Sequence, residues 1–336
     1  MENTAARGVA INRKRVGIFL LDHVMEVFLV ILIVGLTFGA HGFMTWDNWM
    51  NILRSNSLRG VIALGMTMVI IGWQIDLSIG STVALAGVIV ARFCRDLTPL
   101  GVDLNVACVL GMALSFVVAI LIGWMHGTLI TKTGIPPFII TLASKFGLYG
   151  LAGIVSGGYP IANQFPDWFN QIGGGRIGGQ SGVPIPAIIM IVAFLIVLFI
   201  MNYTTTGRAV YAVGGNPESA RLSGIDVGKT IIIILVAVQI LSVVSGFMTS
   251  GQVMAGSYTF GNGWELDVIA AVIIGGTSFN GGIGTVWGTL LGIIFMGVIS
   301  NGMTLLNFDI YTQYIVRAVI MALAVMISSY RAKVKA

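Results

Sequence analysis

Long apolar runs, separated by short polar or glycine-rich stretches, cover most of the chain. A helix that crosses a membrane needs about 20 apolar residues, because its backbone must complete its hydrogen bonds inside the lipid. The pattern therefore predicts an all-α polytopic membrane protein with about ten transmembrane helices. We place the spans at 22–42, 59–74, 78–93, 104–131, 136–157, 184–202, 229–250, 266–278, 283–302 and 311–329.

Composition supports this class. Of the 336 residues, 56% are hydrophobic and 9% are charged, against about a quarter charged in a soluble domain. A soluble enzyme is excluded, and we expect one transmembrane domain over 1–336, with cytoplasmic tails at 1–21 and 330–336. Cys94 and Cys108 have neither the number nor the spacing of a disulfide framework or metal site, so we expect them to pack as small apolar residues.

The positions of the basic residues indicate the orientation of the chain in the membrane. They also account for the net charge of +5, so this charge does not indicate a nucleic-acid partner. With a cytoplasmic N-terminus, eleven lie on the cytoplasmic side: Arg7, Arg13, Lys14, Arg15, Lys132, Arg208, Arg221, Lys229, Arg331, Lys333 and Lys335. Five lie outside: Arg54, Arg59, Arg92, Arg95 and Arg176. The positive-inside rule then predicts that both termini are cytoplasmic.

Three connections are long enough to matter. Residues 43–58 contain Trp46 and Trp49, which are typical of a segment at the outer membrane interface. Residues 157–183 are glycine-rich, and we interpret them as an irregular external loop. Residues 203–228 are predicted to face the cytoplasm.

The cytoplasmic connection contains the pattern of a complete short helix. Asn216 can cap the N-terminus, Pro217 suits the first helical position, and Gly224 can adopt the left-handed conformation that ends a helix. A helix of about two turns is not stable alone in water. It must pack either on the membrane or its own bundle, or in a groove of a cytoplasmic partner.

A possible nucleotide motif nearby is rejected. Gly228, Lys229 and Thr230 resemble the end of a phosphate-binding loop, but Ser223 stands where the motif needs its first glycine. The stretch also opens an apolar span instead of joining a strand to a helix. We therefore expect no cofactor in this chain, and any ATP-driven step must occur in another subunit.

Two glycine-rich breaks interrupt the apolar spans, at 72–81 and 275–285. Both begin at the glycine of an Ile-Ile-Gly sequence, and both end with Ile-Gly and a hydroxyl residue. Paired breaks of this kind indicate a translocation path in transporters, although Ser78 or Ser81 could simply cap the following span. The residues expected to line or gate the path are Asp76, Ser78, Gly80, Gly275, Gly276, Thr277, Ser278 and Asn280.

Other polar and small residues within the spans have simpler interpretations. Glu265 and Asp267 stand at the start of a short span, where carboxylates favour the positive end of the helix dipole, so we expect them to act as caps. His126 and Lys145 have no partner that the sequence identifies. The glycines of the ninth span, spaced four residues apart, predict a close packing face inside the chain or between subunits: Gly284, Gly288 and Gly292.

Three stretches together identify a resemblance: residues 76–81, residues 207–225, and residues 265–271 with 275–282. From about residue 40 to its end, the chain resembles the permease subunits of sugar ABC importers of the ribose, xylose and galactose group. Trp73, Gln74 and Asn280 depart from the family pattern and could bear on the substrate. The resemblance implies a non-catalytic permease in the bacterial cytoplasmic (inner) membrane, with a fold similar to that of the vitamin B12 importer permease.

The resemblance also implies partners and a coupling site. The partners would be a second permease copy or paralogue, cytoplasmic ATPases that bind ATP and Mg, and an external sugar-binding protein. The helix at 217–223 would be the coupling helix seated in the ATPase. The expected coupling residues are Gly207, Arg208, Gly214, Gly215, Asn216, Pro217, Glu218, Ser219, Ala220, Arg221, Leu222, Ser223 and Gly224.

The expected mechanism is alternating access driven by the ATPases, with the binding protein docking near 43–58, 157–183 and 251–264. One alternative is an ion-coupled secondary transporter that uses Asp76, Lys145 or Arg317. Another is a permease of the same superfamily for a nucleoside or a branched-chain amino acid. The identity of the sugar is not readable from these residues.

Overall fold

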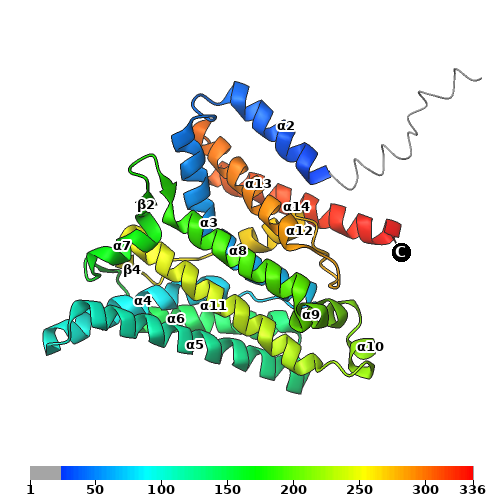
Figure 1. Ribbon diagram of the computed structural model, residues 1–336, viewed down its shortest axis with the longest axis horizontal. Coiled ribbons are helices and arrows are strands. Elements are labelled where there is room, and N and C mark those ends of the chain that lie inside the picture. The colour runs from blue at the N-terminus through cyan, green and yellow to red at the C-terminus, as the bar shows by residue number, and fades with distance from the viewer. Residues whose placement is uncertain (1–23, 336) are drawn as a thin grey trace, which may run out of the picture.

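The structure is a computed structural model that describes residues 24–335 as a bundle of helices (Figure 1). The long helices are α2 (Val24–Gly39), α3 (Trp46–Ile71), α4 (Ile79–Leu97), α5 (Leu104–Thr133), α6 (Pro137–Ser156), α8 (Ile185–Tyr203), α11 (Val227–Val253), α13 (Val286–Leu305) and α14 (Ile310–Lys335). The short ones are η1 (Thr98–Leu100), α7 (Asp167–Gly174), α9 (Thr205–Gly215), α10 (Pro217–Leu222) and α12 (Trp264–Ile274).

The strands are minor. β1 (Ile161–Ala162) pairs antiparallel with β4 (Ala255–Gly256), and β2 (Arg176–Ile177) pairs antiparallel with β3 (Val183–Pro184). Each strand has two residues, so the described part of the chain is an all-α fold with two short antiparallel strand pairs.

A helix lies at each of the expected spans. Within residues 24–335, five helices are long and apolar enough to cross a membrane, namely α5, α6, α8, α11 and α13, and shorter apolar helices occur at Met25–Gly39 and Ile310–Leu323. The all-α, multi-pass membrane class is thus confirmed. The number of spans stays a prediction.

Side-chain caps explain several helix starts. Asp103 accepts hydrogen bonds from the backbone nitrogens of Asn105 and Val106, and α5 begins there. Asp226 caps α11 and Thr285 caps α13 in the same way. These bonds pair backbone donors that the first turn of a helix leaves without partners.

The expectation that 43–58 is a connection between spans is wrong in part, because α3 is helical from Trp46 onward. The polar residues that suggested a loop lie along this helix, and the apolar run that follows simply continues it. Arg54 and Arg59, which we expected on the outer side, are therefore residues of α3.

The expectation of an irregular loop over 157–183 also needs correction. This connection contains α7 together with β1 and β2. Phe169 of α7 is fully buried and stacks on Phe165 at 4.6 Å between ring centroids. Apolar packing therefore orders a segment that its glycine content suggested would be irregular.

The glycine face of the ninth span is shorter than expected. Gly284 precedes α13, which begins at Val286, so Gly284 is not part of the helical face. Gly288 and Gly292 approach the backbone of α12 at Gly275 and Ala271, where a side chain would collide. The close contact is therefore internal to the chain.

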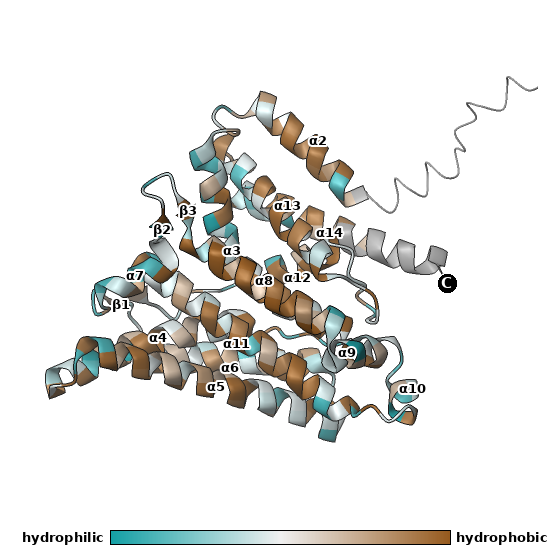
Figure 2. Cartoon of the chain, in the orientation of Figure 1, coloured by the Kyte–Doolittle hydropathy of each residue, from teal (hydrophilic) through white to brown (hydrophobic). Residues whose placement is uncertain are grey.

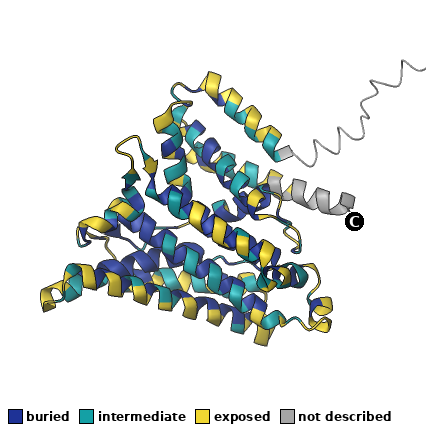
Figure 3. Cartoon of the chain, in the orientation of Figure 1, coloured by how far each residue is buried: buried dark blue, intermediate teal, exposed yellow. Residues whose placement is uncertain are grey.

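The buried centre of the fold is formed by α3, α4 and α11, and other helices cover it (Figure 3). Covering helices such as α5, α6 and α8 expose large apolar side chains, including Leu121, Phe146 and Phe199. Figure 2 shows long apolar stretches along the helices of the bundle. Such surfaces are stable against lipid but not against water. Cys94 and Cys108 are free and buried, as expected.

The N-terminal tail at 1–21 lies outside the described residues, as does residue 336. The expected C-terminal tail at 330–336 is helical as far as Lys335, because α14 continues through it.

Candidate functional site: the α9–α10 connection and the two broken segments

The short helix predicted in the 203–228 connection is α10, with the expected caps. The Asn216 side chain accepts a hydrogen bond of 2.9 Å from the backbone nitrogen of Ser219, and Pro217 occupies the first helical position. Gly224 follows with a φ of +83°, a left-handed conformation that glycine adopts without strain. This local prediction is confirmed.

The outer surface of α10 combines an ion pair with an unusually exposed leucine. Arg221 donates a hydrogen bond of 2.7 Å to Glu218, and this carboxylate raises the pKa of Arg221 above its ordinary value. The side chain of Leu222 is 79% exposed. Ala220, on the inner side, is buried. This small helix therefore presents both charged and apolar groups outward.

Sequence reasoning missed α9, which precedes α10 and anchors it. The Thr204 side chain caps α9 by accepting from the backbone nitrogen of Gly207. Gly207 packs against the backbone of α8 at Ile200 and Met201, while Arg208 is exposed. The predicted coupling residues from Gly207 to Gly224 are thus brought together on two consecutive helices at one end of the bundle (Figure 1).

The inner side of α9 rests on the end of α3, just before the first broken segment, and on the second broken segment. A Cβ at Gly214 would collide with the carbonyl oxygen of Ile71 and lie 2.7 Å from the amide nitrogen of Gly282. That amide itself donates to Ile71 at 2.8 Å. The Tyr211 hydroxyl donates to the carbonyl oxygen of Gly284 at 2.9 Å. A displacement of α9 would therefore be felt at the end of α3 and in the 275–285 segment together.

The first broken segment holds a fully buried polar cluster, which we name the Asp76 cluster: Asp76, Ser78, Thr82, His126 and Gln239. Asp76 accepts hydrogen bonds from the Ser78 backbone and hydroxyl at 2.8 and 2.6 Å, and from Gln239 at 2.7 Å. Thr82 donates to the amide oxygen of Gln239 at 2.5 Å. All of these side chains are at most 2% exposed.

His126 extends the Asp76 cluster to two more helices. Its Nδ1 lies 3.6 Å from Asp76 Oδ2, and its Nε2 shares a hydrogen bond of 2.6 Å with Ser144 of α6. Ser78 occupies the position before α4 without a side-chain cap bond to that helix. The cluster thus joins the first break to α5, α6 and α11. The Ser78 hydroxyl donates to Asp76 and does not cap α4.

The second broken segment is a glycine-shaped turn next to the first. Gly276, Gly281 and Gly282 have positive φ values, and Gly281 lies so near Trp73 that an added Cβ would come within 2.8 Å of it. Thr277 is buried, and its hydroxyl has no hydrogen-bond partner among the described residues. Asn280 is exposed at the tip, and its backbone nitrogen donates to Ser278.

The predicted path residues therefore fall into separate places. Thr277 and its neighbouring glycines meet the end of α3, whereas Asp76 and Ser78 are enclosed in the Asp76 cluster. Gly80 packs on the turn before α12, where an added Cβ would collide with the carbonyl oxygen of Gly261, and the same Cβ would lie 3.1 Å from the Tyr149 hydroxyl of α6. Gly275 packs on α13.

Glu265 and Asp267 lie in the first turn of α12, at the positive end of the helix dipole as expected, but neither forms the cap. The position before the helix is Gly263, which has no side-chain cap. Glu265 is 4% exposed and forms an ion pair with Lys145 of α6, which is 18% exposed. Asp267 pairs with Arg59 of α3 at 3.4 Å and with Arg317 of α14 at 3.5 Å. From the first turn of α12, these carboxylates form ion pairs with neighbouring helices.

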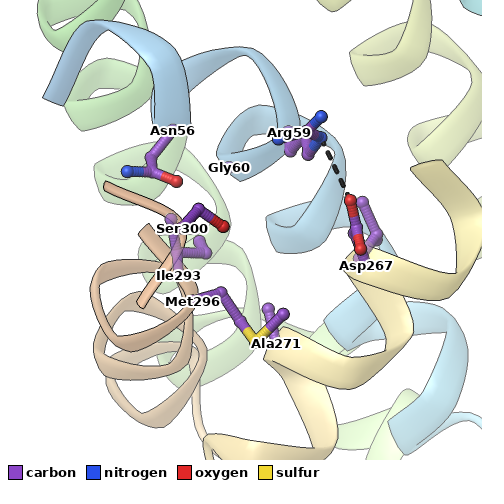
Figure 4. Close-up of a pocket in the computed structure, with 9 residues that line it drawn as sticks. Asn56, Arg59, Gly60, Asp267, Ala271, Ile293, Met296 and Ser300 are labelled. Atoms are coloured by element: carbon purple, nitrogen blue, oxygen red, sulfur yellow. Dashed lines mark ion pairs between the residues drawn. The ribbon is translucent and has the colours of Figure 1, made fainter. Parts of the chain in front are cut away.

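A pocket lies beside the second of these ion-pair groups (Figure 4). It has an empty volume of about 330 Å³ and lies between α3, α12 and α13. Its polar lining consists of Asn56, Arg59, Asp267 and Ser300, and its apolar lining includes Val268, Ile293 and Met296. None of the predicted site residues lines it.

Comparison with known proteins identifies the family. Residues 48–325 match the family described as the permease component of branched-chain amino acid transport systems. The chain belongs to this permease family. The family is one of transport permeases, not of catalytic enzymes.

Individual relatives match almost the whole permease. The ribose import permease of Escherichia coli K12 is 35% identical over 311 residues, which cover 93% of this chain and 94% of that protein. The ribose import permease of Bacillus subtilis is 35% identical over 90% of each chain. The galactose/methyl galactoside import permease of E. coli K12 is 30% identical over 96% of this chain and 98% of that protein. No solved structure matches.

Some of the polar contacts that sequence reasoning missed involve residues that stand out in the sequence of the permease. Gln239 is a polar residue in the middle of the apolar run that forms α11, and Lys145 and Glu265 are opposite charges beside apolar runs. Polar residues at membrane depth almost always pair with one another. The pocket left no such signal, since its residues come from helices far apart in the sequence.

Proposed function

We propose that this permease is the membrane-spanning subunit of an ATP-driven importer for a monosaccharide. The permeases for ribose and for galactose match it over at least nine tenths of its length. The proposal includes ten spans, cytoplasmic termini, a fold like that of the vitamin B12 importer permease, and a second permease copy or paralogue. It also includes an external sugar-binding protein and cytoplasmic ATPases that hold ATP and Mg.

The observation that carries the ATP-driven proposal is the construction of α9 and α10. One side of α10 exposes Leu222 and the Glu218–Arg221 pair, a surface that suits a protein groove. The other side continues through α9 to Ile71, at the end of α3 just before the first broken segment, and to Gly282 of the second. A partner that moves α10 would therefore act on both segments through one rigid connection.

The proposed mechanism is alternating access. The loaded binding protein docks on the side opposite α10, and ATP binding closes the ATPase dimer. α10 and α9 carry that motion to the ends of α3 and α12, which changes the side from which the path is open. The permease moves the sugar without making or breaking a covalent bond.

The ion-coupled alternative relied on Asp76, Lys145 or Arg317. Each of these residues is engaged by an opposite charge or by several hydrogen bonds within the chain. This arrangement favours the partner-driven proposal. The amino-acid alternative has the family's own description in its favour, and the nearly full-length similarity to ribose and galactose permeases against it.

The test is transport by purified components in proteoliposomes. We expect uptake of D-ribose, D-galactose or another monosaccharide only when the permease, its ATPases, the binding protein and ATP are all present. Uptake by the permease alone under a proton or sodium gradient would contradict the ATP-driven mechanism. Uptake of leucine or adenosine in place of every sugar tested would contradict the substrate class.

A further inference from the structure

We propose that Cys94 and Cys108 form a disulfide bond in the assembled permease and so join the outer ends of α4 and α5 covalently. The sequence contains these two cysteines alone, and their spacing along the chain gave no reason to pair them. Both side chains are fully buried. The thiols are free in the structure, and a hydrogen bond links one to the other.

The packing of α4 against α5 places the two cysteines opposite each other. In the middle of the pair, the Ser115 hydroxyl of α5 donates to a carbonyl oxygen of α4 at 3.4 Å. One turn nearer the connection between the helices, a Cβ added at Gly111 would come within 2.8 Å of the Cα of Val90. Residues three or four apart share a face of a helix, so the next step along both helices brings Cys94 to Cys108.

The close approach of the two backbones suits the geometry of a disulfide. Bonded cysteines have Cα atoms about 4.4–6.8 Å apart, so the helices that carry them must pack closely. At Gly111, α5 has no side chain to hold it away from α4. Cys108 is less than one turn from this glycine, and its thiol reaches that of Cys94. The bond therefore needs little movement of either helix.

A metal ion is a poor alternative partner for the two thiols. Protein metal sites with thiolate ligands generally need three or four side chains, and residues 24–335 contain no group of three His, Cys, Asp or Glu that could hold a metal. The pair lies in one buried apolar cluster with Val90, Phe169 and Phe247. A disulfide suits these surroundings because it has no S–H donor that needs an acceptor.

The inference rests on the proposed function for the side of the membrane that this end faces. The connection between α4 and α5 lies at the end of the bundle opposite α10 (Figure 1). It faces outside if α10 meets cytoplasmic ATPases. Disulfides form and persist outside the cytoplasm and are rare within it. The oxidant is a protein disulfide of that outer compartment, which reacts before folding buries the thiols.

The reaction is a thiol–disulfide exchange in two steps. The thiolate of one cysteine attacks a sulfur of the oxidant, forms a mixed disulfide and displaces one oxidant thiolate. The thiolate of the other cysteine then attacks the mixed disulfide and displaces the oxidant. The Cys94–Cys108 bond forms as the oxidant's S–S bond breaks. Two electrons and two thiol protons pass to the oxidant, which leaves as a dithiol.

The bond would complete the attachment of α4 to α5. At the other end of this helix pair, the Asp76 cluster already contains Thr82 of α4 and His126 of α5. With a disulfide near the outer connection, the two helices would be held together at both ends. They would then move as one body when the path changes the side from which it is open.

The test counts free thiols in the full-length permease. Cells are quenched in acid to stop thiol exchange, and the purified chain is unfolded and alkylated with N-ethylmaleimide before or after reduction. We expect no adduct before reduction and two after it, in a chain that migrates as a monomer without reductant. Two adducts on most chains before reduction would overturn the proposal. A disulfide-linked dimer would overturn it as well.

Cys108→Ala is the matched control for the thiol count. Its remaining thiol should give one adduct both before and after reduction, because Cys94 has lost its partner. Absence of that adduct before reduction would mean that Cys94 is oxidised without Cys108, which would contradict the pairing.

A further variant separates this inference from the proposed function. Leu100→Cys, at a position 77% exposed between α4 and α5, is placed in a Cys94→Ala, Cys108→Ala chain. It is labelled in intact cells with a membrane-impermeant maleimide, and we expect labelling from outside. Such labelling together with two free thiols in the unmodified chain would mean that the disulfide is wrong while the proposed function stands. Labelling only after the membrane is opened would contradict the proposed orientation and an outer disulfide with it.

Discussion

The Asp76 cluster lies at the first broken segment and the ion pairs of α12 lie just before the second, and the two regions differ in how their carboxylates are bonded. Around Asp76, hydrogen bonds from Ser78 and Gln239 enclose the carboxylate, and the cluster is inaccessible. Around α12, the second oxygen of Glu265 and the Nε of Arg59 have no hydrogen-bond partner among the described residues. A pocket lies beside α12 as well.

The difference indicates separate roles for the two regions. The buried carboxylate of Asp76, which accepts hydrogen bonds from Ser78 and Gln239, is expensive to separate from them, because each separated group loses its partner without gaining water. An incompletely bonded region can exchange partners at a lower cost. The comparison therefore assigns the larger contribution to stability to the Asp76 cluster and the lower cost of rearrangement to the region of α12.

The largest effect on stability is expected from Asp76→Ala. The change leaves the amide of Gln239 and the ring of His126 without their buried acceptor, at a cost of about 3 kcal/mol or more. Thermal unfolding in detergent measures it. The control is Asp103→Ala, which removes an exposed helix cap worth about 1 kcal/mol. Equal losses in the two variants would remove the distinction between the regions.

A smaller loss is expected from Lys145→Met, which leaves Glu265 without its cation. A double-mutant cycle with Glu265→Gln should give a coupling energy of about 0.5–3 kcal/mol, because the second change removes the unpaired charge. Thermal unfolding of the two single variants and the double variant provides the cycle. Simple additivity would mean that the pair contributes nothing to the attachment of α12 to α6.

Gly224→Val tests the end of α10. Its φ of +83° is strained for a branched residue by roughly 1–2 kcal/mol, so α10 should end in a different geometry and less sugar should be carried per ATP hydrolysed. Gly224→Asn is the control, since asparagine tolerates this conformation. A valine variant with the same transport ratio as the asparagine variant would contradict the role of this turn.

The smallest effect on stability, with a large effect on transport, is expected from Leu222→Ser. This side chain is 79% exposed, and Leu100 at the other end of the bundle is 77% exposed. Replacing either with serine should leave the melting temperature unchanged. Only Leu222→Ser should reduce binding of the ATPase, measured by co-purification. Equal binding by both variants would contradict docking at α10.

Local patterns allowed most of the elements to be predicted from the sequence. The caps at Asn216 and Gly224 follow from the chemistry of a few neighbouring residues, and apolar runs place the spans. The start of α3 was missed because polar residues near Trp46 belong to a helix that packs on other helices. The partners of Asp267 depend on three helices distant in sequence, and no local pattern contains that information.

The most direct test of the proposed coupling route is the pair Gly214→Ala and Gly215→Ala, with sugar carried per ATP hydrolysed as the measurement. A methyl group at Gly214 would collide with Ile71, whereas one at Gly215 meets nothing within 4 Å. Gly214→Ala should separate α9 from both broken segments and lower the transport ratio in transporters that assemble normally. Gly215→Ala should match the unmodified chain. Equal ratios in the two variants would contradict transmission through α9.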